Sequence, residues 1–321
     1  MSGATTFRRV PELPEVEVVR AGLFPAVAGA RIVAVDARDA RALTRHAGGP
    51  LDFESRLTGR RIVGAARRGK FLWLPLAGGE SEGDADSTAG AEAILVHLGM
   101  SGQMLLRADG TPIERHERIR LSIEHPDHGP LDVVFADQRT FGSLAIDALV
   151  PTEDGEAAGW GVPDPLVPSQ VSHIARDPLD AAFRDRAFVH ALARKDSAIK
   201  RVLLDQTVAS GIGNIYADEA LWAARIHPET PARTLSTRAA GRLLTEVRAV
   251  LNRALAEGGT SFDAQYVNVN GQAGYFARSL RAYGRAGQPC ERCGRPIVRA
   301  SFMNRSSHVC PRCQRVPSPL S

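Results

Sequence analysis

The chain has 321 residues, 44% of them hydrophobic and 24% charged, which is enough for two domains with separate cores and excludes a disordered or fibrous protein. No apolar run reaches the ~18 residues of a transmembrane helix, and residues 1–10 lack the apolar segment of a signal peptide, so we expect a cytoplasmic protein. The net charge is +4, but residues 77–93 hold five acidic side chains and no basic one, which leaves +9 elsewhere. This charge is compatible with a polyanionic partner, although many soluble proteins are mildly basic.

Helical and strand-like patterns follow one another in the first half of the chain. Residues 14–28 predict a helix, because Pro14 suits a first turn and apolar residues recur at helical spacing. From residue 31 to 148 the apolar runs are short and often alternate with polar residues, which predicts an antiparallel sandwich or barrel. These runs are RIVAVDA, RIVGAA, FLWLPL, AILVHLGM, QMLLRA, IRLSIEH, LDVVFAD and GSLAIDAL.

The second half of the chain has a helical pattern. Residues 149–180 are rich in Pro, Gly and Asp, which predicts a connection between two domains. Beyond this connection, Asn214 is expected to cap a helix over 215–226, and Ser236 is expected to cap the next helix, which ends before Gly258.

All four cysteines lie near the C-terminus, in the pattern Cys290-x2-Cys293-x16-Cys310-x2-Cys313. Two such pairs can place four thiolates around one tetrahedral zinc ion, with no position left open for a reaction, so the pattern predicts one structural zinc. A redox pair and an iron–sulfur centre are the alternatives, and the basic spacer between the pairs favours a zinc hairpin.

The spacer contains Arg295, Arg299 and Arg305, and His308 lies close to its end. A hairpin this basic and too small to bury a core suits contacts with phosphates, although the same arginines could form only a solvated surface. His308 is not expected to bind zinc, because four thiolates already complete the coordination.

Eight motifs along residues 10–315 occur in an order and spacing that chance does not explain. They are PELPEVE (11–17), RRGK (67–70), HLGMSGQM (97–104), DQRTFG (137–142), LLDQTVASGIGNIYADEAL (203–221), GGTSFD (258–263), GQAGYF (271–276) and a finger ending FMNRSSHVCPRCQ. Together they resemble the bacterial formamidopyrimidine-DNA glycosylases of the Fpg/Nei superfamily.

The resemblance implies an α+β fold, in which an N-terminal helix joins a two-layered antiparallel β-sandwich. A helical domain with a helix–two-turns–helix motif and a C-terminal four-cysteine zinc-finger hairpin follow. The implied divisions are an extension over 1–10 that is absent from the mature protein, a catalytic β-sandwich domain over 11–150, a connection over 151–180, a helix–two-turns–helix DNA-binding domain over 181–276, and a zinc finger over 277–315.

The resemblance also implies a bifunctional DNA glycosylase and AP lyase of base-excision repair, which removes 8-oxoguanine and formamidopyrimidines. Pro11 matches the family's N-terminal proline, whose amine forms a Schiff base with the sugar before β,δ-elimination. Glu12 matches the acid–base residue. Lys70 matches the lysine that contacts the phosphates around the lesion, and Arg305 matches the finger arginine that binds phosphate and assists the second elimination.

A second set of residues matches the family's DNA contacts. Met100, Arg139 and Phe141 match the residues that fill the gap left by a flipped base. Asn214, at a helix N-terminus, matches a phosphate contact, His116 matches another DNA contact, and residues 271–276 resemble the loop that closes over the flipped base.

The sequence departs from the family pattern at three places. Thr140 replaces a second arginine of the DxRRFG motif, which we expect to weaken contact with the DNA backbone, and Asp196 stands at a position that is often basic. Ten residues precede Pro11, and a proline within a chain has no basic amine. Translation from the Val10 codon, read as GUG, would make Pro11 the first residue once the initiator methionine is removed.

Two alternatives to a start at Val10 remain open. Proteolysis could remove the leader, or the chain could be a non-catalytic, DNA-binding zinc-finger paralogue, although retention of the catalytic set argues against the paralogue. Within the superfamily, an endonuclease VIII-like enzyme for oxidised pyrimidines is the alternative activity. The expected partner is damaged double-stranded DNA, with no membrane partner. The expected protein is a monomer of the bacterial cytoplasm that associates with the nucleoid when bound to DNA.

Overall fold

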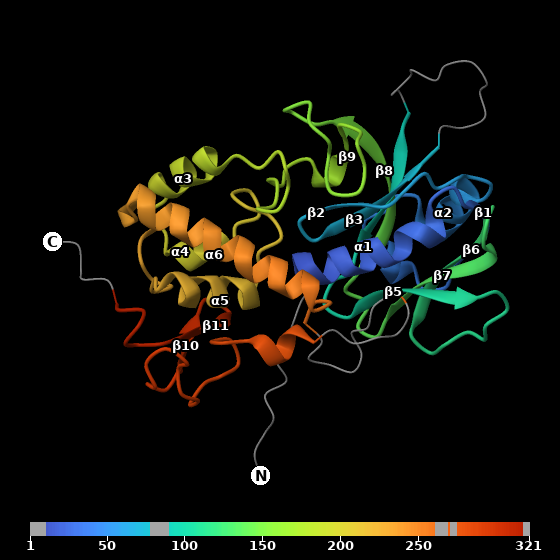
Figure 1. Cartoon of the computed structure of the whole chain (residues 1–321). Helices are drawn as coiled ribbons and strands as arrows, with labels where there is room; N and C mark the ends of the chain where they lie inside the picture. The colour runs from blue at the N-terminus through green and yellow to red at the C-terminus, as the bar shows by residue number, and fades with distance from the viewer. Residues whose placement is uncertain (1–10, 78–89, 261–268, 270–274, 317–321) are drawn as a thin grey trace, which may run out of the picture. The chain divides into compact units, whose positions relative to one another are not determined.

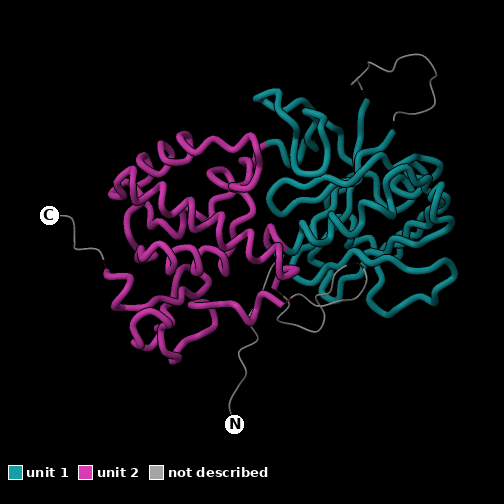
Figure 2. Tube along the Cα trace, in the orientation of Figure 1, with its two compact units in different colours: residues 1–11, 15–172, 261–273 teal, residues 12–14, 173–260, 274–321 magenta. Residues whose placement is uncertain are grey.

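The computed structural model describes residues 11–77, 90–260, 269 and 275–316. The chain divides into two compact units (Figure 2). Unit 1 contains residues 1–11, 15–172 and 261–273, and unit 2 contains residues 12–14, 173–260 and 274–321. The predicted extension over 1–10, most of the predicted loop over 77–93 and most of the predicted closing loop over 271–276 lie outside the described residues.

Unit 1 contains two antiparallel sheets, with strand orders β1-β6-β7-β5 and β2-β3-β4-β8-β9 (Figure 1). The strands are β1 (Arg31–Ala37), β2 (Ala66–Arg68), β3 (Phe71–Leu76), β4 (Glu92–His97), β5 (Gly102–Ala108), β6 (Glu117–His125), β7 (Gly129–Asp137), β8 (Ser143–Pro151) and β9 (Leu166–Pro168). Its helical segments are α1 (Leu13–Val27), η1 (Ala40–Leu43), α2 (Gly49–Leu57) and η2 (Ser169–Val171).

One apolar core joins the two sheets to α1. Val16, Val19 and Leu23 of α1 belong to the same buried cluster as Ile119 of β6 and Leu72 of β3. Along β6 buried and less buried residues alternate, as expected of a strand with one face toward a core. The predicted two-layered sandwich is therefore confirmed, and the predicted helix over 14–28 matches α1.

Two local predictions in unit 1 fail. Most of the run RIVGAA lies outside regular strands, because Arg61 and Ile62 form isolated bridges and β2 begins only at the last residue of the run, Ala66. Helix α2 is absent from the sequence-based prediction, because it is only nine residues long and buries only Phe53 and Leu57. Both regions take their conformation from packing rather than from a strong local pattern.

Unit 2 is helical and ends in a hairpin. Its helical segments are α3 (Asp185–Ala193), α4 (Ile199–Leu203), α5 (Asn214–Ala224), η3 (Ala232–Thr234), α6 (Thr237–Ala256) and η4 (Phe276–Ser279), and its hairpin strands are β10 (Val298–Phe302) and β11 (Arg305–Val309). Helix α5 packs against α6 and β11, so most of its residues are buried (Figure 1). The predicted cap at Ser236 is confirmed, since its hydroxyl accepts the N–H of Ala239 at 3.2 Å.

None of the helices in the described part of the chain combines the length and the apolar character that crossing a membrane requires.

Candidate functional site

The carboxylate of Glu12 lies at the N-terminal end of α5. Its two oxygens accept the backbone N–H groups of Ile215 at 3.2 Å and of Tyr216 at 3.5 Å, and the residue is only 4% exposed. The positive end of the helix dipole stabilises a buried carboxylate in this place. A Cβ atom on Gly213 would lie 2.0 Å from Cδ of Glu12, so only glycine at that position admits the carboxylate.

Asn214 does not cap α5, which corrects the sequence-based expectation. It is the first residue of the helix, Gly213 occupies the cap position, and the amides of the first turn face Glu12 instead. Nδ2 of Asn214 donates to the carbonyl of Ser306 at 3.2 Å, which ties the hairpin residue next to Arg305 to α5. Oδ1 is buried and accepts no hydrogen bond within the described residues.

A buried ion pair joins helix α4 to helix α5. Nζ of Lys200 is 2.6 Å from Oδ1 of Asp218, and both side chains are at most 1% exposed. Lys200 also donates to the Ser306 carbonyl at 3.0 Å and to the Ser307 hydroxyl at 2.8 Å. Burial lowers the pKa of Lys200, while the charge of Asp218 opposes that shift. The backbone N–H of His308 donates to Oδ2 of Asp218 at 2.8 Å, so this imidazole lies beside a carboxylate.

Replacement of Lys200 by methionine is expected to lower the free energy of unfolding by about 3–5 kcal/mol, because it leaves the Asp218 carboxylate buried without its cation. Urea denaturation of the zinc-loaded protein measures the loss. The double variant K200M/D218L should recover part of it, since the buried charge is then gone but the N–H of His308 loses its acceptor. Equal stability of K200M and the wild type would contradict this account.

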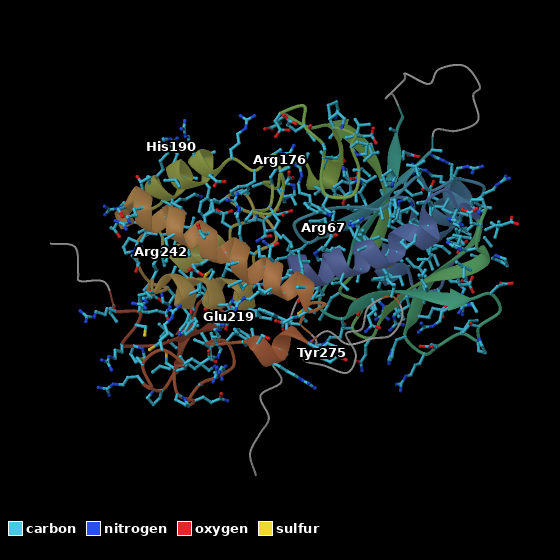
Figure 3. All side chains as sticks on the ribbon, viewed as in Figure 1. Arg67, Arg176, His190, Glu219, Arg242 and Tyr275 are labelled. Carbon is cyan, nitrogen blue, oxygen red and sulfur yellow. The ribbon has the colours of Figure 1, made fainter. Side chains whose placement is uncertain are left out.

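A second buried carboxylate, in helix α5, fixes the chain that leads into the cysteine region (Figure 3). Glu219 accepts the backbone N–H groups of Ala282 and Tyr283 at 2.8 Å and of Arg281 at 3.0 Å. Burial raises the pKa of Glu219, and the three N–H donors oppose the shift. The segment at 281–283 is thus anchored to α5.

In unit 1, Asp137 organises the two turns that carry Met100, Arg139 and Phe141. Its Oδ2 accepts the N–H groups of Phe141 at 2.9 Å and Gly142 at 2.8 Å, and its Oδ1 accepts the N–H of Arg139 at 3.0 Å. Oδ1 also accepts the Ser101 hydroxyl at 2.5 Å. One carboxylate, 1% exposed, therefore holds the loop after β7 and the turn before β5 together.

Close backbone packing joins the same two turns. Gly99 has φ of +60°, and a Cβ there would lie 2.5 Å from the carbonyl carbon of Phe141. Phe141 is 58% exposed and the guanidinium carbon of Arg139 lies 5.8 Å from its ring centroid, whereas Met100 is partly buried. The backbone carbonyl of His116 accepts the N–H of Asp137 at 2.9 Å, so His116 lies beside this group.

Replacement of Asp137 by asparagine is expected to lower the free energy of unfolding by about 2–4 kcal/mol, because the neutral amide cannot accept all four donors and brings an N–H2 group against them. Chemical denaturation measures the change. The exposed neighbour Gln138 provides the control, and Q138A should match the wild type. If D137N is as stable as Q138A, the carboxylate does not organise the turns.

Lys70 lies in the two-residue turn between β2 and β3, with Gly69 at φ of +57° in the first turn position, as in type II′ hairpins.

The imidazole of His97 lies in the turn region that carries Met100. Burial is the largest cause of a fall in the pKa of His97 to about 4, and the charges of Arg45 and Lys70 lower this pKa further. The imidazole is therefore neutral near pH 7, and its Nδ1 accepts the N–H of Gly99 at 3.2 Å, which steadies the turn that carries Met100.

The four cysteines form one cluster in unit 2. Their Sγ atoms all lie within 4.8 Å of one another, and Cys290 and Cys310 are buried. A tetrahedral zinc ion with Zn–S bonds of ~2.3 Å places its sulfurs ~3.8 Å apart, so the cluster fits zinc. The hairpin of β10 and β11, with Arg305 at its exposed end, lies between the two cysteine pairs.

Charge is distributed unevenly between the units. Unit 2 carries 22 lysine and arginine residues against 12 aspartate and glutamate residues, and unit 1 carries 18 against 24. The net charges are therefore +10 and −6. A polyanion is attracted chiefly to unit 2, which contains Asn214 and Arg305.

Sequence-based reasoning missed Asp137, Lys200 and Asp218 as organising residues. Asp137 and Asp218 lie within the family motifs, but nothing in the motifs shows that these charges are buried. Of the predicted residues, the structure groups Met100, Arg139 and Phe141 in unit 1, and Glu12, Asn214 and Arg305 around α5 and β11 in unit 2.

Three family models match successive parts of the chain. Residues 10–144 match the formamidopyrimidine-DNA glycosylase N-terminal domain, and residues 174–265 match the H2TH domain of the same enzymes. Residues 287–316 match the zinc finger found in FPG and IleRS. Together with the cysteine cluster, this last match confirms the prediction of one structural zinc.

Whole-length relatives agree with these matches. The chain is 64% identical to the formamidopyrimidine-DNA glycosylase of Leifsonia xyli, over 96% of this chain and 100% of the relative. Two solved complexes of Lactococcus lactis Fpg are each 28% identical and cover 95% of this chain and 100% of their own. One contains abasic-site DNA, with a TM-score of 0.75, and the other contains N7-benzyl-Fapy-dG DNA, with a TM-score of 0.77.

Proposed function

The chain belongs to the formamidopyrimidine-DNA glycosylase family, and we propose that it removes oxidised purines, 8-oxoguanine and formamidopyrimidines, from duplex DNA. It is a base-excision repair glycosylase, and the lyase activity known for the family accompanies this activity. The observation that carries the proposal is the placement of Glu12, next to Pro11, at the N-terminal end of α5. The endonuclease VIII-like and non-catalytic alternatives are not favoured.

The proposed nucleophile is the secondary amine of Pro11. Its nitrogen forms a bond to C1′ of the deoxyribose while the bond from C1′ to the damaged base breaks, and the base leaves with a proton. The C1′–O4′ bond of the resulting aminal then breaks as O4′ takes up a proton, which leaves an iminium ion between C1′ and the proline nitrogen. This iminium ion acidifies the C2′ proton, whose loss begins the elimination of the phosphates. This chemistry requires a free amine, so the proposal includes an active protein that begins at Pro11.

Glu12 is the proposed proton donor and acceptor at the sugar. Its carboxylate is anchored by two backbone N–H groups, which support a fixed position for this group. Lys70 and Arg305 are the proposed contacts for the phosphates beside the lesion. Arg305 lies at the exposed turn of the zinc-finger hairpin, where zinc, when bound, supplies a cross-link between the two ends of the hairpin.

The proposed residues that replace a flipped base are Met100, Arg139 and Phe141. The exposed aromatic ring of Phe141, with the guanidinium group of Arg139 beside it, suits contact with unpaired bases. Because Asp137 holds both turns, these residues are expected to enter the DNA as one group. Asn214, at the start of α5, is a proposed phosphate contact, and His116 is another proposed DNA contact.

The proposed partner is damaged double-stranded DNA. The positive charge of unit 2 supports this partner, as do the DNA complexes of the structural neighbours. We also propose that the protein is a monomer and acts in the bacterial cytoplasm, where chromosomal DNA lies.

Borohydride trapping on a panel of lesions tests the proposed function. Protein that begins at Pro11 is incubated with duplexes that carry 8-oxoguanine, a formamidopyrimidine, an oxidised pyrimidine or no lesion, and is then reduced. We expect covalent adducts mainly with the two purine lesions. Adducts mainly with the pyrimidine lesion would favour the endonuclease VIII-like activity, and binding without any adduct would refute the enzyme.

A further inference from the structure

A tryptophan at the C-terminal end of α5 touches the cysteine cluster. Trp222 is 2% exposed, and its indole N–H donates to Sγ of Cys290 at 3.4 Å. We propose that Trp222 is a positioning residue of the zinc site, which holds the zinc-bound thiolate of Cys290, fastens the finger to α5 and slows the loss of zinc.

Two arginines support this contact. The guanidinium carbon of Arg292 lies 3.9 Å from the centroid of the Trp222 ring, and that of Arg281 lies 5.8 Å from it. Arg292 also donates to the backbone carbonyls of Trp222 at 2.6 Å and Ala223 at 3.0 Å, in the last turn of α5. Arg292 lies between two zinc ligands in the chain, so it anchors the first cysteine pair to α5.

The second cysteine pair is tied to the same region. Oε1 of Gln314 accepts the N–H of Cys310 at 2.9 Å, while its Nε2 donates to the carbonyl of Ile226, just after α5, also at 2.9 Å. Both cysteine pairs thus have side-chain links to the end of α5. The link through Trp222 is the one that reaches a sulfur atom directly.

The physical effect of this link follows from charge. Four thiolates around Zn²⁺ carry a net charge of −2, which the indole N–H donor stabilises at Cys290. The edge of this buried ring lies against the buried sulfur of Cys290, which limits the access of water and chelators to it. Removal of a group that hydrogen-bonds to a metal ligand typically lowers metal affinity or activity by about 10- to 100-fold.

The zinc-loaded full chain with Trp222→Phe tests the proposal, because phenylalanine keeps an aromatic ring and loses the N–H donor. Zinc release is followed with an excess of 4-(2-pyridylazo)resorcinol, which captures the released ion as a coloured complex. We expect release about tenfold faster than in the wild type. The matched control is Trp73→Phe, since Trp73 is fully buried in unit 1 and its Nε1 has no hydrogen-bond partner among the described residues. Wild-type release from W222F, or equal acceleration in W73F, would overturn the proposal.

A second measurement covers the case in which W222F does not fold. The chain has three tryptophans, so the variant W73F/W160F leaves Trp222 as the single tryptophan emitter. Its fluorescence should change with the same rate constant as zinc release. Constant emission throughout the loss of zinc would refute the contact. Neither readout uses DNA, so failure here is separate from failure of the glycosylase assignment.

Discussion

Addition of one glycine before Pro11 is expected to abolish covalent trapping on lesion-bearing DNA. An acylated proline nitrogen has neither a proton nor a basic lone pair, so it cannot form the iminium ion. Loss of the nucleophile in a covalent mechanism costs roughly 10⁴-fold or more in rate. Single-turnover base excision and borohydride trapping, with protein that begins at Pro11 as reference, measure the effect.

The matched control for this prediction keeps a free amine. Pro11→Gly at the first position retains a primary amine, so it should still trap DNA, although more slowly. The glycine-extended protein should keep its zinc and bind the duplex, which separates lost chemistry from lost folding. Trapping by the extended protein at the reference rate would show that another residue is the nucleophile.

Replacement of Cys310 by serine is expected to remove the zinc and unfold the hairpin that carries Arg305. The reason is that the two strands bury only two apolar side chains, Phe302 and Val309, so the hairpin has almost no apolar core of its own. Structural zinc contributes about 10–16 kcal/mol to the folding of isolated finger peptides. Zinc content by mass spectrometry should fall from one ion per chain to none, and binding of lesion duplex should weaken at least tenfold.

Ser301→Ala is the control for the hairpin, because Ser301 is exposed on β10 and lies outside the cysteine cluster. It should keep the zinc and bind DNA as the wild type does. Stoichiometric zinc in C310S would contradict a four-thiolate site. Unchanged DNA binding by a zinc-free C310S protein would show that the finger does not contribute to the interface.

Elements with strong local signals could be predicted from the amino-acid order alone. Seven of the eight predicted strands largely coincide with regular strands, because alternation such as that along β6 is fixed by one buried face. The zinc ligands followed from spacing, since two CxxC pairs satisfy tetrahedral coordination without help from the rest of the chain. The ordered motifs around Pro11, Lys70 and Asn214 were enough to indicate the family.

Hydrogen bonds and ion pairs between residues that are far apart in the chain could be learned only from the tertiary structure. The first-turn amides of α5 donate to Glu12, some 200 residues away in the chain, so Asn214 is not the cap that local preference predicts. The pairing of Lys200 with Asp218 and the indole contact of Trp222 with Cys290 also join separate segments. Local periodicity reports which face of an element is buried, whereas the partner of a buried charge or sulfur depends on packing between elements.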